Sequence, residues 1–158
     1  MIFSIILLSC QSEELATRSP STLAPAQKIA DTPSSSTLVR RLSVRDTGLD
    51  CKTLEAVNLR EELTYVVENV SRPPWAGMRA AACLAELFPN ESKTDFVRWV
   101  KDPNTKGLAF LLAGQLEKLP DPVAIDVAEA ALSGPHAPDF RIRLEKVNDI
   151  RMKELLEK

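Results

Sequence analysis

The chain has 158 residues, which is enough for one domain with a single hydrophobic core. It contains 20 lysines and arginines and 22 aspartates and glutamates, so the formal net charge is -2. This balance gives no support for a nucleic-acid partner, because such binding usually requires a strongly basic surface. The short basic run of Arg40, Arg41 and Arg45 is typical of a solvated segment and does not alter that conclusion.

An apolar, uncharged segment opens the chain over residues 1–9, MIFSIILLS, and is followed by Cys10. It is far shorter than the ~20 residues that a membrane-spanning helix needs, and it has the length of a signal-peptide hydrophobic region. The tetrad Leu7-Leu8-Ser9-Cys10 resembles the lipobox, the cleavage signal of bacterial lipoproteins. That resemblance implies that residues 1–9 are removed and that Cys10 carries the lipid. The mature protein would then be attached to a membrane of the bacterial cell envelope.

Two features depart from the lipobox pattern. No lysine or arginine precedes the hydrophobic region, which is compatible with a true start upstream of Met1. Leu8 is also bulkier than the residue usual at that place. The alternative is an apolar N-terminal strand or helix with a buried Cys10, which the polar stretch that follows disfavours. Gln11 comes after Cys10, and by the enterobacterial sorting rule a residue other than aspartate implies the periplasmic face of the outer membrane.

Residues 10–45 have the composition of a flexible linker, because serine, threonine, proline and alanine dominate them. Pro20, Pro25 and Pro33 interrupt any long element. Such a stretch buries too little apolar surface to offset the entropy of ordering. We therefore predict a tether between the lipid and a domain over 46–158, with irregular or short ordered structure at 37–45. As a coil, ~26 residues average roughly 25–30 Å from end to end.

Residues 46–158 show helical periodicity and predict an all-α domain. Leu59, Leu63, Val66, Val67 and Val70 mark one face of the first helix. Proline pairs and Asp-Pro steps separate the segments. The expected helices cover 52–70, 75–88, 93–101 (capped by Ser92), 105–119, 122–133 (begun by Asp121 and Pro122) and 139–156. No segment predicts a strand, and the short connections favour helical hairpins packed side by side.

Three stretches, 79–87, 107–119 and 122–132, share a pattern of small residues and leucines. In the first, Ala80, Ala81, Leu84 and Leu87 have the spacing that lets two helices approach closely. This pattern resembles HEAT-like α-solenoid repeats, and Arg79 is similar to the basic residue near the start of their second helix. The resemblance implies a scaffold for protein–protein interaction. An irregular helical bundle would show the same stripes, so both architectures stay open.

Two cysteines, Cys51 and Cys83, remain after Cys10. In an oxidising envelope compartment they are candidates for a disulfide, and closing a loop of roughly 30 residues contributes about 3–4 kcal/mol in the chain-entropy model. The alternative is that Cys83, inside AAACLAEL, is a small buried hydrophobic residue. Two thiols and one histidine without ligand-like spacing do not predict a metal site.

No catalytic motif appears in the chain, and its five glycines form no phosphate- or cofactor-binding loop. His136, the single histidine, has no recognisable partner and is interpreted as a solvated loop residue. Trp75 and Trp99 are expected to pack between helices, with Trp99 partly exposed. The segment 141–158 is expected to cap the open end of the domain.

We therefore expect a lipid-anchored scaffold that binds an unknown envelope protein, with no cofactor, metal or nucleic acid. The competing hypothesis is an enzyme, or an accessory subunit of one, that uses a pocket between helices. A third possibility is an intracellular helical protein whose start is misassigned.

Overall fold

The computed structural model describes residues 33–45, 48–147 and 150–156. Over these residues the chain forms eight α-helices and two short 3-10 turns, with no strand, so the all-α prediction is confirmed. The helices are α1 (Pro33–Ser43), α2 (Leu59–Asn69), α3 (Pro74–Leu87), α4 (Lys93–Lys101), α5 (Lys106–Ala113), α6 (Asp121–Leu132), α7 (Ala137–Leu144) and α8 (Ile150–Leu156). The 3-10 turns are η1 (Cys51–Thr53) and η2 (Leu116–Lys118).

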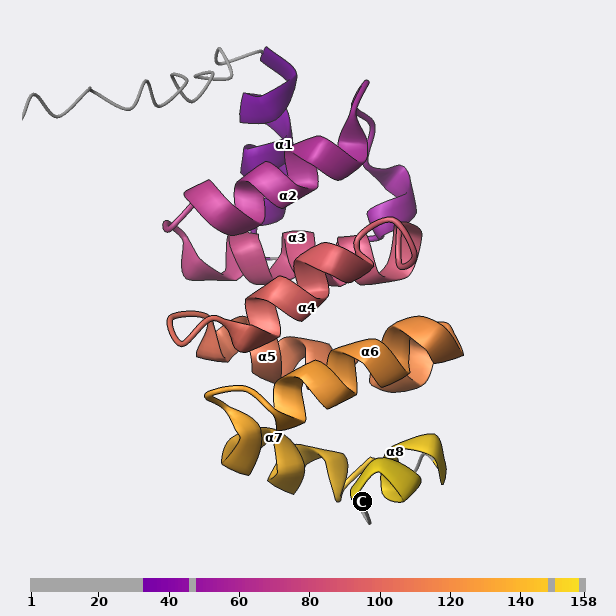
Figure 1. Ribbon diagram of the computed structural model, residues 1–158. Helices are drawn as coiled ribbons and strands as arrows, with labels where there is room; N and C mark the ends of the chain where they lie inside the picture. Colours follow the sequence, from indigo (N-terminus) through magenta and orange to yellow (C-terminus); the bar gives the residue numbers. More distant parts are fainter. Residues whose placement is uncertain (1–32, 46–47, 148–149, 157–158) are drawn as a thin grey trace, which may run out of the picture. The chain divides into compact units, whose positions relative to one another are not determined.

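The helices from α2 to α7 form three successive pairs, α2/α3, α4/α5 and α6/α7 (Figure 1). The second helices of the pairs follow one another in space, because α3 packs on α5 and α5 packs on α7. The first helices of the pairs form a second layer of successive helices. Ion pairs join α2 to α4, and α4 packs closely on α6. At the two ends, α1 packs on the first pair and α8 packs on the last. These helices belong to one compact unit, Asp31–Lys158.

Small residues allow the helices of a pair to approach closely. In α3, Ala76, Ala80 and Ala81 are fully buried, and a Cβ atom added at Gly77 would lie 3.5 Å from the carbonyl oxygen of Val67 in α2. Close approach of two helix backbones needs such residues at the crossing point. The small-residue stripes that were evident in the sequence thus lie at the interface between paired helices.

The three second helices also share a register. Residue numbers 80, 112 and 144 are evenly spaced, 32 apart, and Ala80, Leu112 and Leu144 are all completely buried. The three occupy equivalent places in α3, α5 and α7. In α4, both aromatic rings, those of Phe96 and Trp99, are buried.

Within the predicted linker over 10–45, Pro33–Ser43 forms α1. Short ordered structure was expected at 37–45, but the helix begins four residues earlier, where a flexible linker was predicted. Leu38 and Leu42, one helical turn apart, are buried in the core. Side chains of α3 satisfy the carbonyl groups at the end of α1, where no intrahelical partner exists. Trp75 Nε1 donates to the Ser43 oxygen (3.1 Å), and Arg79 Nη1 donates to the Leu42 oxygen (3.3 Å). The rest of the predicted linker, residues 10–32, lies outside the described residues.

Other boundaries also differ from the prediction. The helix expected over 52–70 begins only at Leu59, because the Asp50 carboxylate accepts a hydrogen bond from the Lys52 amide and sets the separate turn η1. The helix expected to reach residue 119 ends at Ala113, where the Gly114 amide closes the last turn of α5. The C-terminal segment forms two helices, α7 and α8, instead of one, and α8 covers α6 and α7 as the capping prediction requires.

Two expected helix caps are not made. Asp121 is the first residue of α6 rather than its cap, and its carboxylate pairs with Arg151 of α8. Ser92 precedes α4, but its hydroxyl makes no capping hydrogen bond and is buried. Both helix ends are therefore held by packing against neighbouring helices.

None of the helices in the described part of the chain combines the length and the hydrophobicity that crossing a bilayer requires.

Candidate interaction surface

Three large apolar side chains stand exposed at matching places on α3, α5 and α7. Met78 is 40% exposed, Phe110 38% and Ile142 55%, and their numbers follow the same step of 32 as the buried set. Single exposed hydrophobic residues are ordinary on protein surfaces. Here the three lie at equivalent positions on helices that pack side by side, and we call them the apolar row. Val44 and Val57 are exposed too, but they lie between α1 and α2.

The two helix layers differ in charge. Helices α3, α5 and α7 carry four basic and two acidic residues, a net charge of +2. Helices α2, α4 and α6 carry four basic and seven acidic residues, a net charge of -3. The apolar row therefore belongs to the basic layer, although the whole chain is slightly acidic. Such an asymmetry favours an acidic partner on the side of the row.

Cations flank the apolar row at close range. The Lys106 ammonium lies 5.7 Å from the ring centre of Phe110, and it also pairs with Asp139 of α7 at 2.5 Å. Arg143 follows Ile142 directly, and Lys146 comes four residues after it. Both are exposed, as is Glu145 between them, and among the described residues neither cation forms an ion pair. A surface of this kind, an apolar centre with charges at its edge, is the usual anatomy of a protein-binding patch.

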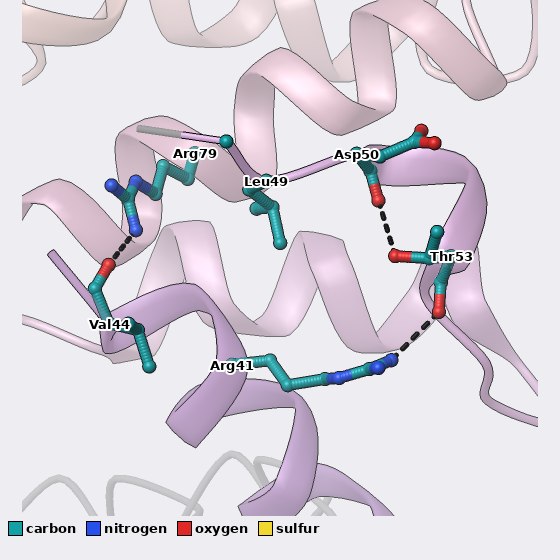
Figure 2. Close-up of a pocket in the computed structure, with 7 residues that line it drawn as sticks. Arg41, Val44, Leu49, Asp50, Thr53 and Arg79 are labelled. Carbon is teal, nitrogen blue, oxygen red and sulfur yellow. Dashed lines mark hydrogen bonds between the residues drawn. The ribbon is translucent and has the colours of Figure 1, made fainter. Parts of the chain in front are cut away.

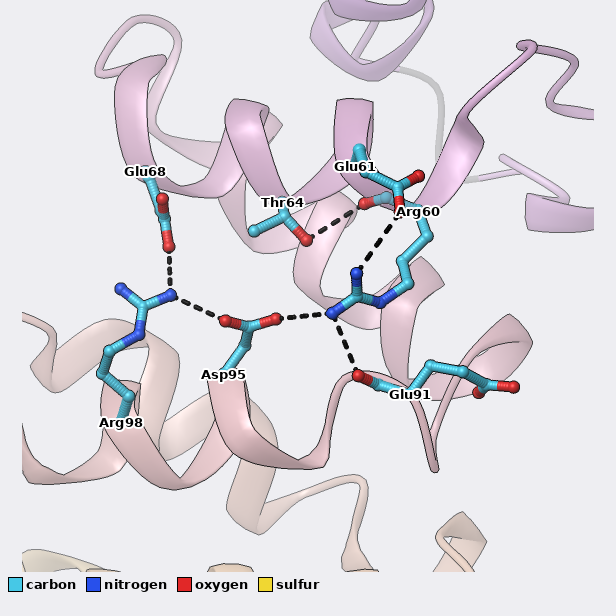
Figure 3. A network of polar contacts seen from close by, with 7 residues as sticks. All are labelled: Arg60, Glu61, Thr64, Glu68, Glu91, Asp95 and Arg98. Carbon is cyan, nitrogen blue, oxygen red and sulfur yellow. Dashed lines mark hydrogen bonds and ion pairs between the residues drawn. The ribbon is translucent and has the colours of Figure 1, made fainter. Parts of the chain in front are cut away.

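On the opposite layer, charged side chains bind one another (Figure 3). Asp95 of α4 accepts from Arg60 of α2 at 3.1 Å and from Arg98 at 2.7 Å, and Arg98 also pairs with Glu68. The hydrogen bond that Arg98 donates to Asp95, followed by the one it donates to Glu68, raises the pKa of Arg98 above its ordinary value. Because these groups already satisfy each other, the network joins the first pair of helices to the second and offers few open charges to a partner.

A hollow of about 270 Å³ near α1 contains two arginines, Arg41 and Arg79 (Figure 2). Both guanidinium groups donate to backbone carbonyls: Arg41 to Thr53 at 2.7 Å, and Arg79 to Leu42 and Val44. Their role is therefore to hold α1 and η1 against α3. Arg79, which the repeat resemblance singled out, donates to a carbonyl oxygen 35 residues away in the sequence.

A second hollow, of about 290 Å³, opens between the start of α3 and the start of α5. We call it the α3–α5 notch. No charged residue lines it, and Met78 of the apolar row forms part of its wall. Its lining residues are Val67, Val70, Ser71, Pro74, Gly77, Met78, Asn104, Thr105, Gly107 and Leu108.

Of the site residues expected from sequence, Cys10 lies outside the described residues. Cys51 and Cys83 meet in a disulfide, with their Cα atoms 5.3 Å apart, which attaches η1 to α3. This separation is within the usual range for a disulfide.

The interpretation of His136 as a solvated residue was wrong, because its side chain is only 8% exposed. Its Nε2 lies 3.0 Å from the carbonyl oxygen of Asp102 and bridges two connecting turns. Trp99 is likewise buried, at 3% exposure, with its ring centre 5.9 Å from that of Phe96. Both residues therefore belong to the buried interior of the domain.

Among the described residues, no three histidine, cysteine, aspartate or glutamate side chains converge as metal ligands would. The comparisons with known proteins found no matching family, no matching curated protein and no matching solved structure.

Sequence analysis missed the apolar row, although a signal was present. An apolar residue recurs at the same step as a buried one two positions later, at Met78 and Ala80, Phe110 and Leu112, and Ile142 and Leu144. This double recurrence becomes visible only after α3, α5 and α7 are aligned as equivalent helices.

Proposed function

We propose that this chain is a lipid-anchored protein of the bacterial envelope whose helical repeats bind a partner protein through the face of α3, α5 and α7. The observation that carries the proposal is the apolar row of Met78, Phe110 and Ile142. Leaving these side chains in water is unfavourable by about 25 cal/mol per Å² of apolar surface. A partner that covers the row recovers this free energy.

The helix arrangement supports a scaffold role. Stacked helix pairs, in which each pair contacts mainly its neighbours, present a regular surface of successive helices. This arrangement is compatible with the HEAT-like resemblance of the sequence. The lipobox-like tetrad ending at Cys10 supports attachment to a membrane, and the Cys51–Cys83 pair suits the oxidising compartment that such attachment implies.

Site-specific photocrosslinking tests the docking face. A photoreactive amino acid is placed at Phe110 of the full chain, and the matched control carries it at Thr94, an exposed residue of α4 in the other layer. After irradiation of native envelopes, we expect one defined protein adduct from position 110 and none from position 94. Substituting Ile142→Glu should remove the adduct, because a carboxylate interrupts the apolar row. Equal crosslinking from both positions, or none from position 110, would contradict the proposal.

A further inference from the structure

At the boundary between α5 and α7, two polar contacts lie at positions equivalent to the α3–α5 notch. At that second boundary, Asp139 pairs with Lys106 at 2.5 Å, and His136 reaches the Asp102 carbonyl at 3.0 Å. The positions 32 residues before Asp139 and His136 are their equivalents at the first boundary. They are occupied by Gly107 and Asn104. At the first boundary, glycine and asparagine therefore stand in place of the aspartate and histidine that make these contacts at the second.

The size of the notch decides what it accepts. Pockets for drug-sized ligands have volumes of about 300–1,000 Å³, and the notch, at about 290 Å³, lies just below that range. Half of its ten lining residues carry large apolar side chains, which are Val67, Val70, Pro74, Met78 and Leu108. The absence of a charged lining residue disfavours a charged metabolite. A single large apolar side chain, presented by a peptide, matches both its volume and its chemistry.

The position of the notch indicates how such a peptide runs. Met78 lines the notch, and Phe110 and Ile142 continue the row across the next two helices. Packed helices lie about 8–10 Å apart, which is close to the ~10.8 Å of two turns of an α-helix. Alternate residues of a β-strand repeat at only about 6.6 Å. A helix laid across the layer therefore places apolar residues at heptad intervals over the row.

The net positive charge of α3, α5 and α7 favours a negatively charged partner. The net charge of +2 on α3, α5 and α7 contrasts with -3 on α2, α4 and α6. Arg143 and Lys146, which follow Ile142 in the sequence, are exposed and form no ion pair among the described residues. Carboxylates at the edge of a bound helix would meet these cations, whereas a basic helix would be repelled.

We infer that the notch receives one large apolar side chain of an acidic amphipathic helix, belonging to a partner protein, whose other apolar residues pack on Phe110 and Ile142. This inference rests on the proposed function, because it specifies the partner of the same face.

Gly107 allows a sharp test, because a Cβ atom added there meets nothing within 4 Å. Gly107→Trp should fill the notch, and Gly107→Ala is the matched control that adds only one methyl group. The full chain, kept in detergent, is used to select binders from a phage-displayed library of random peptides. The selected peptides are then measured against both variants and against Phe110→Glu. Thermal unfolding verifies that each variant is folded.

We expect selected peptides that are rich in aspartate and glutamate and carry large apolar residues at heptad spacing. Gly107→Trp should weaken their binding about tenfold or more, the loss typical of a buried anchor, while Gly107→Ala changes it less than about twofold. Added salt should weaken binding as well.

The possible results distinguish the claim about the notch from the claim about the docking face. Binders that keep their affinity for Gly107→Trp but lose it for Phe110→Glu would overturn the notch and leave the docking face intact. Binders indifferent to both variants, or no binders at all, would overturn both. A basic consensus, or prolines at every third position, would overturn the acidic helix as the occupant.

Discussion

Individual glycines show how differently the turn after α6 and the first turn of α5 are packed. A Cβ atom at Gly134, in the turn after α6, would lie 3.0 Å from the carbonyl oxygen of Val100 and 3.2 Å from that of Ala130. At Gly107 the same atom would enter open space. Neither glycine has a positive φ angle, so the difference between them is steric and not conformational.

These contacts predict opposite effects of one substitution. Gly134→Ala should lower the free energy of unfolding by about 1–2 kcal/mol, because backbone oxygens must move to admit the methyl group. Gly107→Ala should raise it by about 0.5–1 kcal/mol, since alanine loses less conformational entropy than glycine within a helix. Urea unfolding of the two variants measures both values. A stabilised Gly134→Ala variant would show that α4 is not packed against this turn.

At the scale of secondary structure, α1 shows that composition alone misjudges an element. Its sequence, PSSSTLVRRLS, has few features of a stable helix. It forms because Leu38 and Leu42 enter the core and because Trp75 and Arg79 bind its terminal carbonyls. Most helical stability in proteins comes from such tertiary packing rather than from intrinsic propensity.

Leu42→Ala tests whether α1 belongs to the folded domain. Its side chain is completely buried, so we expect a loss of about 2–4 kcal/mol in the free energy of unfolding. Arg40→Ala, on the exposed side of the same helix, should change it by less than about 0.5 kcal/mol. Chemical denaturation with hydrogen exchange along α1 provides the measurement. If both substitutions have equally negligible effects, α1 belongs to the linker and not to the folded domain.

At the scale of the whole molecule, the proposed function requires both a binding surface and a signal for membrane attachment. If Cys10 is the attachment site, Cys10→Ala expressed in a bacterial host should lose labelling by radioactive palmitate and keep residues 1–9. Cys83→Ser is the control, because the same thiol chemistry without the lipobox context should leave the labelling unchanged. Mass spectrometry of the N-terminus and sensitivity to globomycin provide independent readouts. An unlabelled wild-type chain in a competent host would refute the anchor.

The sequence by itself determined the all-α class, the position of α4 to the residue and the approximate extents of α3 and α6. Periodic apolar positions and proline breaks are local signals, and local signals suffice for elements of this kind. They also identified Cys51 and Cys83 as a candidate pair, but not whether the two residues lie close together.

Only the tertiary structure decided which apolar residues remain exposed to solvent. Met78, Phe110 and Ile142 are as hydrophobic as their buried neighbours, and what exposes them is the rotation of α3, α5 and α7 against the first helices. The same packing buries His136 and Trp99, recruits residues 33–43 into a helix and opens the notch beside Gly107. These features depend on contacts between segments about 30 residues apart, and no local pattern encodes such contacts.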